Sequence, residues 1–300
     1  MIIENLKVKN GKYKRYLGSP LRYAGGKTLA VGMIAELIPN NIKKVVSPFI
    51  GGGSVEIALA KELGLEVVAY DIFDLLVNYW QQQTTNGKQL YEKLKTMPNT
   101  KEEYKRVKDI LKQHWDKEKG YDGQLDPIDA AVYYYYNMQL SYGPGFLGWM
   151  SSNYLKDKTY NNAIEKVRDF NVPNLKVYKK GFEESIPENQ NEFLYLDPPY
   201  VLEGDSKMFK GMYPSRDIAV HHNGFNHHKL AELLHQHKGG FILSYNDCTL
   251  VRELYKDYEI KEVQWQYTMG QGETRIGKTR QNRDYDNTNV KHSHELLIIG

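Results

Sequence analysis

Residues 45–54 are Val45-Val-Ser-Pro-Phe-Ile-Gly-Gly-Gly-Ser54, an apolar run that ends in three consecutive glycines. The short run predicts a buried strand, and the glycines predict a tight turn because they tolerate left-handed backbone conformations. Residues 55–63 have the apolar spacing of a helix, for which Ser54 is the expected N-cap. Residues 66–70 predict another strand. The order strand, glycine turn, helix, strand is typical of a parallel α/β sheet.

An acidic residue at the end of this unit indicates the class of ligand. Asp71 follows Gly51 by 20 positions, the spacing at which a carboxylate binds ribose hydroxyls in nucleoside-binding folds. Glu56 stands where a dinucleotide fold has its third glycine, and its charge disfavours a pyrophosphate at the helix start. The unit therefore favours a nucleoside without phosphates, such as S-adenosylmethionine, whose sulfonium is a cation. A plain tight turn is the alternative interpretation of the glycines alone.

A second stretch contains candidate functional groups. Residues 193–200 are Phe193-Leu-Tyr-Leu-Asp-Pro-Pro-Tyr200. The first four predict a short buried strand, and the prolines end it because they cannot extend a hydrogen-bonded ladder. The stiff turn carries the carboxylate of Asp197, the carbonyl of Pro198 and the ring of Tyr200. Such groups accept hydrogen bonds from a planar amine and stack on the ring that bears it. An ordinary turn is the alternative, since Asp-Pro pairs often begin turns.

Composition sets the limits of the interpretation. The 300 residues allow one large domain or two modest ones, and 41% hydrophobic with 26% charged residues is typical of a soluble globular protein. The net charge of +3 permits nucleic-acid binding without requiring it. A single cysteine, Cys248, excludes an internal disulfide and fits a reducing cytoplasm. Gly26-Lys27-Thr28 does not complete a phosphate-binding loop, because Leu21 stands in place of the required glycine.

Residues 80–165 differ in character from the rest of the chain. They are polar and mixed in charge, and then contain the tyrosine run Ala131–Tyr136 and the loop Ser141–Trp149. Glycines, a proline and aromatic rings in one loop suit stacking or wedging against bases. We therefore expect three rings to contact DNA, with packing inside the loop as the alternative: Tyr142, Phe146 and Trp149.

The C-terminal part predicts two more strands, at residues 259–267 and 294–299, which would pair antiparallel. The long polar loop between them is hypothesised to contact DNA phosphates through Arg275, Lys278, Arg280 and Arg283. Residues 201–222 are expected to form a mobile lid after the Asp-Pro-Pro-Tyr turn.

These pieces, in this order, resemble the DNA adenine N6-methyltransferases of the Dam type. The resemblance covers nearly the whole chain and rests on Tyr23-Ala-Gly-Gly-Lys27, Pro48-Phe-Ile-Gly-Gly-Gly-Ser54, Asp71, the tyrosine run, Asp197-Pro-Pro-Tyr200 and Ser244-Tyr-Asn-Asp247. It implies a site-specific enzyme that transfers a methyl group from S-adenosylmethionine to N6 of an adenine flipped out of double-stranded DNA, leaving S-adenosylhomocysteine.

The resemblance also implies site residues. The cofactor would contact Tyr23, Lys27, Phe49, Gly51, Gly53, Ser54, Asp71, Phe182 and Asp197, with Phe182 near its adenine. The catalytic residues would be Asp197, Pro198, Pro199 and Tyr200, and no metal is expected. The stretch from Tyr142 to Trp149 lacks the arginine of the family member that recognises GATC, so that specificity is not expected to carry over.

The expected architecture is a doubly wound, Rossmann-like methyltransferase sheet, mostly parallel with an antiparallel C-terminal edge. Residues 1–79 and 166–300 would form the catalytic domain, and residues 80–165 a helical target-recognition insert. The glycine turn and Asp197 should follow adjacent strands at one end of the sheet. We expect a monomer in the cytoplasm of a prokaryote, or a phage-encoded protein, with a cognate restriction endonuclease as a candidate partner.

Four other functions stay open. Methyltransferases that act on cytosine N4 usually carry serine in place of Asp197, and those that act on a protein amide usually carry asparagine there. RNA is an alternative substrate. A DNA-binding module that keeps the fold without catalysis is the alternative of another class.

Overall fold

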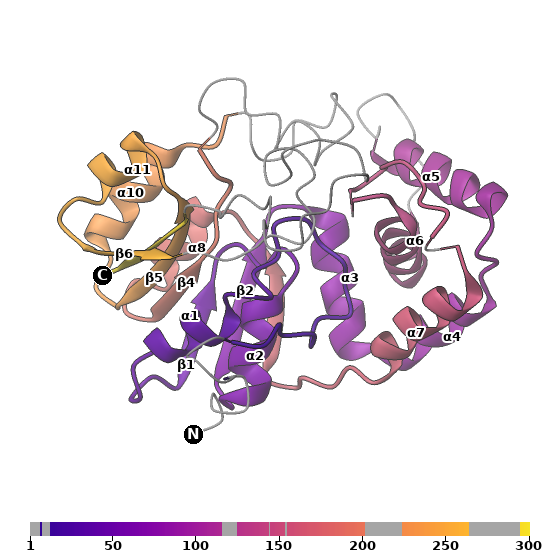
Figure 1. Ribbon diagram of the computed structural model, residues 1–300, viewed down its shortest axis with the longest axis horizontal. Coiled ribbons are helices and arrows are strands. Elements are labelled where there is room, and N and C mark those ends of the chain that lie inside the picture. The colour runs from indigo at the N-terminus through magenta and orange to yellow at the C-terminus, as the bar shows by residue number, and fades with distance from the viewer. Residues whose placement is uncertain are drawn as a thin grey trace, which may run out of the picture.

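The computed structural model describes residue 7 and residues 13–115, 125–143, 145–153, 155–201, 224–263 and 295–300. Its strands are β1 (Lys44–Ser47), β2 (Glu66–Asp71), β3 (Leu175–Lys179), β4 (Phe193–Leu196), β5 (Phe241–Asn246), β6 (Glu259–Val263) and β7 (Glu295–Ile299). They form a 7-stranded sheet in the order β3-β2-β1-β4-β5-β7-β6 (Figure 1). The first five positions in this order are parallel, and β7 runs antiparallel to both β5 and β6. The predicted mostly parallel sheet with an antiparallel C-terminal edge is confirmed.

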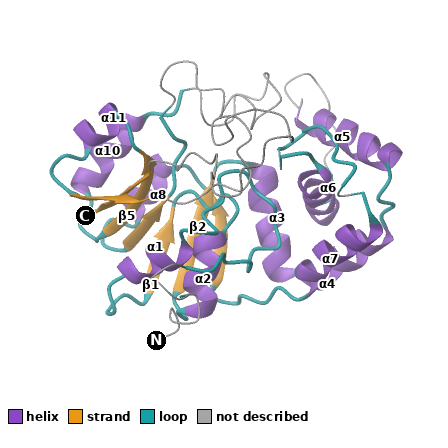
Figure 2. Ribbon diagram, viewed as in Figure 1, coloured by secondary structure: helices purple, strands orange, loops and turns teal. Residues whose placement is uncertain are grey.

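Helices cover both faces of the sheet, as in a doubly wound fold (Figure 2). The described helices are α1 (Val31–Leu37), α2 (Ser54–Glu62), α3 (Asp74–Thr85), α4 (Gly87–Thr96), α5 (Lys101–Trp115), α6 (Pro127–Leu140), α7 (Asp157–Arg168), α8 (Phe182–Glu188), α10 (His227–Gln236) and α11 (Thr249–Leu254). Side chains of α1, α2 and α3 join one buried cluster, and those of α8, α10 and α11 join another. None of the helices in the described ranges has the length and apolar character to cross a membrane.

The central strands are apolar on both faces because both faces are covered. In β4, Phe193 and Tyr195 belong to one buried cluster, whereas Leu194 and Leu196 belong to the other. All four are buried, and each apolar side chain contributes about 1.5–3 kcal/mol by leaving water. This burial fixes the strand that leads into Asp197.

The helices α4 to α7 gather beside the sheet, at the right of Figure 1. The tyrosine run forms their core: Tyr134, Tyr135 and Tyr136 are fully buried in α6. The ring of Tyr135 stacks on Tyr79 of α3 at 5.7 Å between centroids, and its hydroxyl donates to the carbonyl of Ala163 at 2.9 Å. The tyrosines therefore hold this helical unit together.

Helix α3 connects this helical unit with the sheet. The side-chain amide of Gln81 donates to the carbonyl of Val177 in β3 at 3.0 Å, while Tyr79 in the same helix packs against α6. The predicted insert boundaries at residues 80 and 165 fall inside α3 and α7. The division into a catalytic domain and an insert stays a prediction.

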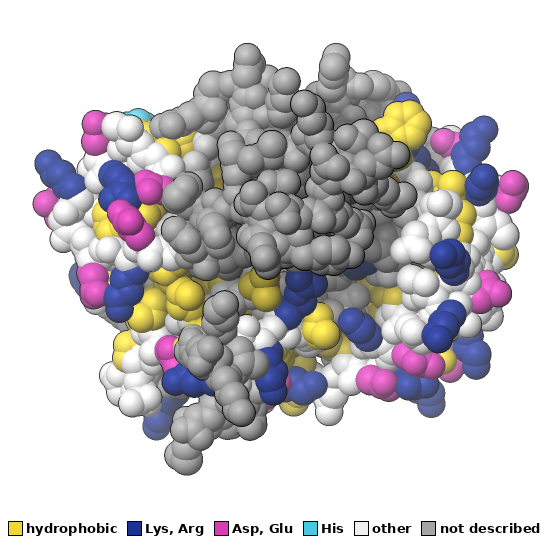
Figure 3. All heavy atoms as spheres, in the orientation of Figure 1, with side chains coloured by type: hydrophobic (Ala, Val, Ile, Leu, Met, Phe, Trp, Pro, Cys, Tyr) yellow, Lys and Arg dark blue, Asp and Glu magenta, His cyan; other side chains and the backbone are white. Residues whose placement is uncertain are grey.

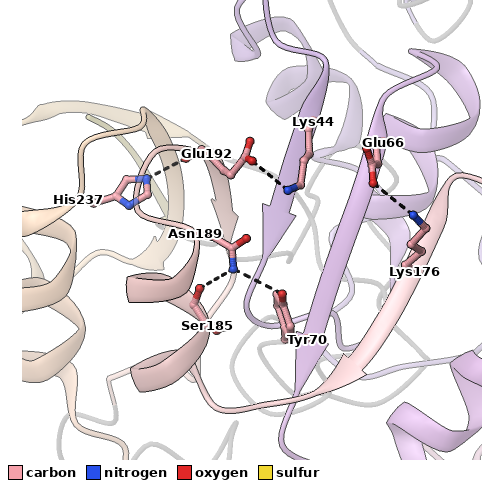
Figure 4. Close-up of polar contacts among 8 residues, drawn as sticks. All are labelled: Lys44, Glu66, Tyr70, Lys176, Ser185, Asn189, Glu192 and His237. Atoms are coloured by element: carbon pink, nitrogen blue, oxygen red, sulfur yellow. Dashed lines mark hydrogen bonds and ion pairs between the residues drawn. The ribbon is translucent and has the colours of Figure 1, made fainter.

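Polar contacts join the strands at the end of the sheet where β1 and β2 begin (Figure 4). Lys44 pairs with Glu192 at 2.9 Å, and Glu66 pairs with Lys176 at 3.4 Å. The ring nitrogen Nε2 of His237 lies 2.9 Å from the carbonyl of Glu192. Ion pairs this exposed contribute at most about 1 kcal/mol each, so apolar packing carries most of the stability here.

The start of α2 differs from the prediction in two respects. Gly53, with a left-handed φ of 66°, is the N-cap, and Ser54 is the first helical residue, so the N-cap assignment of Ser54 was wrong. Glu56 in the first turn is buried and accepts a hydrogen bond from the hydroxyl of Ser47 at 2.6 Å. Burial raises the pKa of Glu56 to about 8, against the opposing hydrogen bond from Ser47. The carboxyl group is therefore mostly protonated at neutral pH, so the expectation that its negative charge disfavours a pyrophosphate at this helix start was wrong.

Replacing Glu56 by glutamine should change how stability depends on pH. The pKa in the folded state, about 8, lies above the ordinary value of 4.5, so this group's contribution to stability is complete below pH 4.5 and is lost as the pH rises through 8. Glu56→Gln keeps the shape and an acceptor for Ser47 but cannot ionise. At pH 9 it should raise the free energy of unfolding by on the order of 1–4 kcal/mol. Urea denaturation at pH 5, 7 and 9 measures this; equal declines in both proteins would contradict it.

Candidate active site

The glycine turn after β1 is closely packed and needs its glycines. Gly51 and Gly53 have left-handed φ values of 45° and 66°. A Cβ on Gly52 would stand 2.7 Å from Cβ of Tyr23, and one on Gly53 would stand 2.9 Å from the ring of Trp80. The turn is therefore held between Tyr23 and Trp80, with the predicted residue Tyr23 directly against it.

Two side chains that the sequence did not single out also hold this turn. The indole nitrogen of Trp80 donates to the carbonyl of Gly51 at 3.0 Å, and the hydroxyl of Ser19 donates to the carbonyl of Gly52 at 2.7 Å. Trp80 lies in an apolar helix, where a sequence pattern predicts only an ordinary core residue. Its role becomes visible only when α3 is placed against the turn.

Asp71 stands beside the turn, at the end of β2. Its carboxylate accepts the backbone N–H of Gly51 at 3.3 Å and that of Phe73 at 3.1 Å. Burial raises the pKa of Asp71 to about 6, and the backbone hydrogen bonds from Phe73 and Gly51 oppose that rise. A carboxylate in this place is a suitable acceptor for the two hydroxyls of a ribose.

The glycine turn and Asp197 share one end of the sheet. Strand β1 pairs in parallel with β4, with Val45 opposite Phe193 and Val46 opposite Leu194. The turns that follow parallel neighbours lie at the same edge, so the expectation for Gly51–Gly53 and Asp197 is confirmed. In open α/β sheets, ligands bind at this edge.

Lys27 lies against the Asp-Pro-Pro-Tyr turn. Its ammonium nitrogen is 2.7 Å from Oδ1 of Asp197 and 4.8 Å from the ring centroid of Tyr200. The Lys27 side chain is 4% exposed and that of Asp197 is 23% exposed, so Lys27 lies deeper in the protein than the carboxylate with which it pairs. Burial raises the pKa of Asp197, and the Lys27 ammonium opposes the rise. Contact of Lys27 with a cofactor stays a prediction.

Side chains of β5 and β7 contact Tyr200. Its ring is buried, its hydroxyl donates to the carboxylate of Glu295, and the same hydroxyl lies 3.5 Å from that of Ser244. The ring also packs against Tyr245 with 6.0 Å between centroids. The orientation of Tyr200 is thus fixed by β5 and β7, while its stacking on a base stays a prediction.

Three phenylalanines form an aromatic cluster near Asp71. The centroid of Phe182 lies 5.8 Å from that of Phe49 and 5.0 Å from that of Phe225. The segment that carries Phe182 lies next to Ile72, since a Cβ on Gly181 would be 3.6 Å from the side chain of Ile72. Phe225 was not predicted, because a single phenylalanine in a polar stretch gives no signal. The cluster offers an apolar wall for a planar heterocycle.

The predicted DNA-contacting rings separate into two groups. Tyr142 is 56% exposed and Trp149 is 79% exposed. Phe146 is half-buried, with its centroid 5.1 Å from that of Phe73, before α3, and 5.9 Å from that of Tyr134, in the middle of α6. Phe146 therefore supports the loop, and the exposed rings that favour a DNA contact are Tyr142 and Trp149.

The loop that carries these rings is tied to the protein by polar contacts. The backbone N–H of Leu147 donates to the side chain of Asn137 at 2.8 Å, and the hydroxyl of Tyr104 donates to the carbonyl of Gly148 at 3.0 Å. The guanidinium of Arg22 donates to the carbonyls of Gln139 and Ser141, at 2.5 and 3.2 Å. Since Tyr23 covers the glycine turn, its neighbour Arg22 joins that turn to the base of the loop.

The predicted basic contacts to DNA, Arg275, Lys278, Arg280 and Arg283, and nearly all of the lid at 201–222 lie outside the described residues. On the face drawn in Figure 3, basic and acidic side chains of the described residues are interspersed. The described side chains on this face therefore do not form a uniformly basic surface.

Residues 23–269 match the D12 class N6 adenine-specific DNA methyltransferase family. The chain belongs to this family. It is 26% identical to the type II methyltransferase M1.LlaDCHI of Lactococcus lactis subsp. cremoris, over 86% of this chain and 91% of that protein. It is 24% identical to M.CviBI of Paramecium bursaria Chlorella virus NC1A, over 86% and 94% of the two chains. Against M.FokI of Planomicrobium okeanokoites it is 24% identical over 92% of this chain but 44% of that longer protein.

The D12 assignment agrees with the arrangement of the site. The match spans the Tyr23–Lys27 loop, the glycine turn and the Asp197 turn, which the fold brings to one edge of the sheet. The chain is an adenine-specific DNA methyltransferase by family, and its sheet is the Rossmann-like sheet expected for such an enzyme.

Proposed function

We propose that this D12 protein transfers the methyl group of S-adenosylmethionine to N6 of an adenine rotated out of duplex DNA at a specific site. The observation that carries the proposal is that Asp197 directly follows β4, the parallel neighbour of β1, which leads into the turn at Gly51–Gly53. A hydrogen-bond acceptor for the amine and a turn suited to the cofactor therefore occupy one edge of the sheet.

The residues around the glycine turn fit the cofactor. S-adenosylmethionine supplies, when bound, a methyl group on a cationic sulfur. Asp71 is placed to accept the ribose hydroxyls, and Phe49 and Phe182 offer an apolar surface for the adenine ring. Gly51 is half-buried beside Tyr23, and Gly53 is buried against Trp80. The proposed contacts of this turn with the cofactor would be made by its backbone. Ser54, at the start of α2, is also predicted to contact the cofactor.

Asp197 and Pro198 are the proposed acceptors of the two N–H groups of the target amine. The adenine amine is a poor nucleophile because its lone pair is delocalised into the ring, and two acceptors favour a pyramidal nitrogen. The nitrogen becomes positively charged as it reacts, so the fixed carboxylate stabilises the transition state more than the ground state. The ammonium of Lys27, 2.7 Å from the carboxylate, favours the ionised form of Asp197.

The remaining residues of the turn would position the base. Pro198 and Pro199 restrict the backbone on both sides of the acceptor carbonyl. Tyr200 is the proposed stacking face, and the extruded base would be captured there after leaving the duplex. Holding both reactants in line contributes a large part of the rate acceleration in such a site.

The exposed ring of Trp149 should contribute to DNA binding. Base–aromatic stacking is worth about 1–3 kcal/mol per base, so Trp149→Ala should weaken DNA binding by about 5-fold to 150-fold. Tyr178→Ala is a matched control, because Tyr178 is 47% exposed but lies in the edge strand β3. Fluorescence anisotropy with labelled duplex measures both. Equal affinities of the two variants would count against this contact.

Partners follow from the same proposal. The relatives are type II methyltransferases, so we infer a cognate restriction endonuclease that acts on the same DNA site. We also propose that the enzyme acts as a monomer. A DNA substrate fits a location in a prokaryotic cytoplasm.

The proposed reaction is tested by incubating duplex DNA with methyl-labelled S-adenosylmethionine and digesting the product to nucleosides. The label should appear in N6-methyldeoxyadenosine. Label in N4-methyldeoxycytidine, or label only in RNA or protein added to the same reaction, would replace the proposal with one of its alternatives.

A further inference from the structure

The Asp-Pro-Pro-Tyr turn is not part of the hydrogen-bonded ladder between β4 and β5. The pairing of β4 with β5 ends at Leu196, opposite Leu243. Pro198 and Pro199 carry no N–H that could extend this ladder. The position of Asp197 and of the Pro198 carbonyl therefore depends on how the chain is held after the prolines.

The side chain of Asn246 holds the backbone at Val201. The N–H of Val201 donates to Oδ1 of Asn246 at 3.0 Å, and Nδ2 of Asn246 donates to the carbonyl of Val201 at 3.0 Å. Asn246 is the last residue of β5, the strand beside β4. Its amide thus takes the place of a strand partner and satisfies both backbone groups of one residue.

The residue before Val201 is held by the cross-strand partner of Asn246. In the antiparallel pairing of β5 and β7, Asn246 is directly opposite Glu295. Directly opposed residues project to the same face of a sheet. The buried carboxylate of Glu295 accepts the hydroxyl of Tyr200. Asn246 and Glu295 therefore hold two consecutive residues. Asn246 binds the backbone of Val201, and Glu295 binds the phenol hydroxyl of Tyr200.

We propose that Asn246 and Glu295 are positioning residues that fix the Asp-Pro-Pro-Tyr turn for methyl transfer. The proposal rests on the function proposed above and adds the residues that would hold its two hydrogen-bond acceptors, Asp197 and the Pro198 carbonyl, in position. Between Leu196 and Val201 the chain is short and carries two prolines, so fixing both ends fixes the carbonyl of Pro198. Misplacement of a reacting group by about 1 Å can cost about 10²-fold in rate.

The change Asn246→Ala should lower kcat by about 10-fold to 100-fold. The dissociation constant for S-adenosylmethionine should change much less than kcat, because most of the expected cofactor contacts, Asp71 and the glycine turn among them, follow β2 and β1 rather than β5. Asn174→Ala is the matched control. The Asn174 amide donates to the carbonyls of Ala60 and Leu65, at 2.8 and 2.6 Å, near the opposite end of the sheet. It should lower stability and leave kcat near the wild-type value.

Two conservative variants separate positioning from general stability. Asn246→Asp keeps an acceptor for the N–H of Val201 and regains a donor only when protonated. An aspartate carboxyl ordinarily titrates at about pH 3.9, and the neighbouring carboxylate of Glu295 would raise that pKa. The kcat of the variant relative to that of the wild type should therefore rise as the pH is lowered from 7 to 5. Glu295→Gln keeps an acceptor for the Tyr200 hydroxyl and should retain several-fold more activity than Glu295→Ala.

The outcomes distinguish the two proposals. Absence of adenine methylation by the wild-type protein would refute the proposed function. Methylation by the wild type together with an unchanged kcat in folded Asn246→Ala, or a loss no larger than in Asn174→Ala, would refute the positioning role alone. If Asn246→Ala does not fold, the pH profile of Asn246→Asp decides, and a constant ratio to the wild type would overturn the proposal.

Discussion

Asp197→Ala should abolish detectable methyl transfer, a loss of at least about 10³-fold in kcat. The variant lacks the carboxylate that would accept the amine N–H and stabilise the positive nitrogen in the transition state. It also leaves the nearly buried ammonium of Lys27 without the carboxylate that lies 2.7 Å away. We therefore expect a folded protein of lower stability, since breaking a buried ion pair costs about 3–5 kcal/mol. Single-turnover kinetics with labelled cofactor, together with circular dichroism, measures both effects.

An exposed carboxylate provides the control for that loss. Asp169 pairs with Arg168 at 2.7 Å and has a side chain that is 63% exposed. Asp169→Ala should change kcat and the free energy of unfolding only slightly, because exposed ion pairs contribute little. Activity of Asp197→Ala within a few-fold of wild type would refute the catalytic assignment.

Asp71→Ala should raise the dissociation constant for S-adenosylmethionine by about 10-fold to 150-fold, the loss of one charge-assisted hydrogen bond. The carboxylate form accepts ribose hydroxyls, and the pKa of Asp71 is about 6. Affinity of the wild type should therefore level off above about pH 7 and fall as the pH drops through 6. Asp71→Asn cannot ionise and should show no such fall. Calorimetric titration between pH 5 and 8 measures this, and lost DNA binding with unchanged cofactor affinity would mean that the ribose site is misplaced.

Local patterns in the sequence predicted much of the fold and of the site. The strand, glycine turn, helix and strand at residues 45–71 form as expected, because glycine permissiveness and apolar periodicity act over a few residues. The position of Asp197 followed from the prolines that end β4, and the pairing of β6 with β7 followed from alternation of apolar residues. These features need no knowledge of distant contacts.

The rest depends on contacts between residues far apart in the chain. Trp80 and Phe225 reach the site from segments whose patterns indicate nothing unusual. Asn246 and Glu295 act together only because β7 inserts between β5 and β6, an order that the chain does not show. Phe146 was expected to contact DNA, with packing inside the loop as the alternative. Its ring is half-buried against Phe73 and Tyr134, and its contact with DNA stays a prediction.

The central claim is that Asp197 directs methyl transfer to adenine N6 in DNA. Methylation-sensitive sequencing of DNA from a host that expresses the wild-type protein, compared with a host that expresses Asp197→Ala, tests it most directly. We predict N6-methyladenine at one short recurring sequence with the wild type and none with the variant. Methylcytosine in place of methyladenine, or equal adenine methylation in both hosts, would contradict the claim.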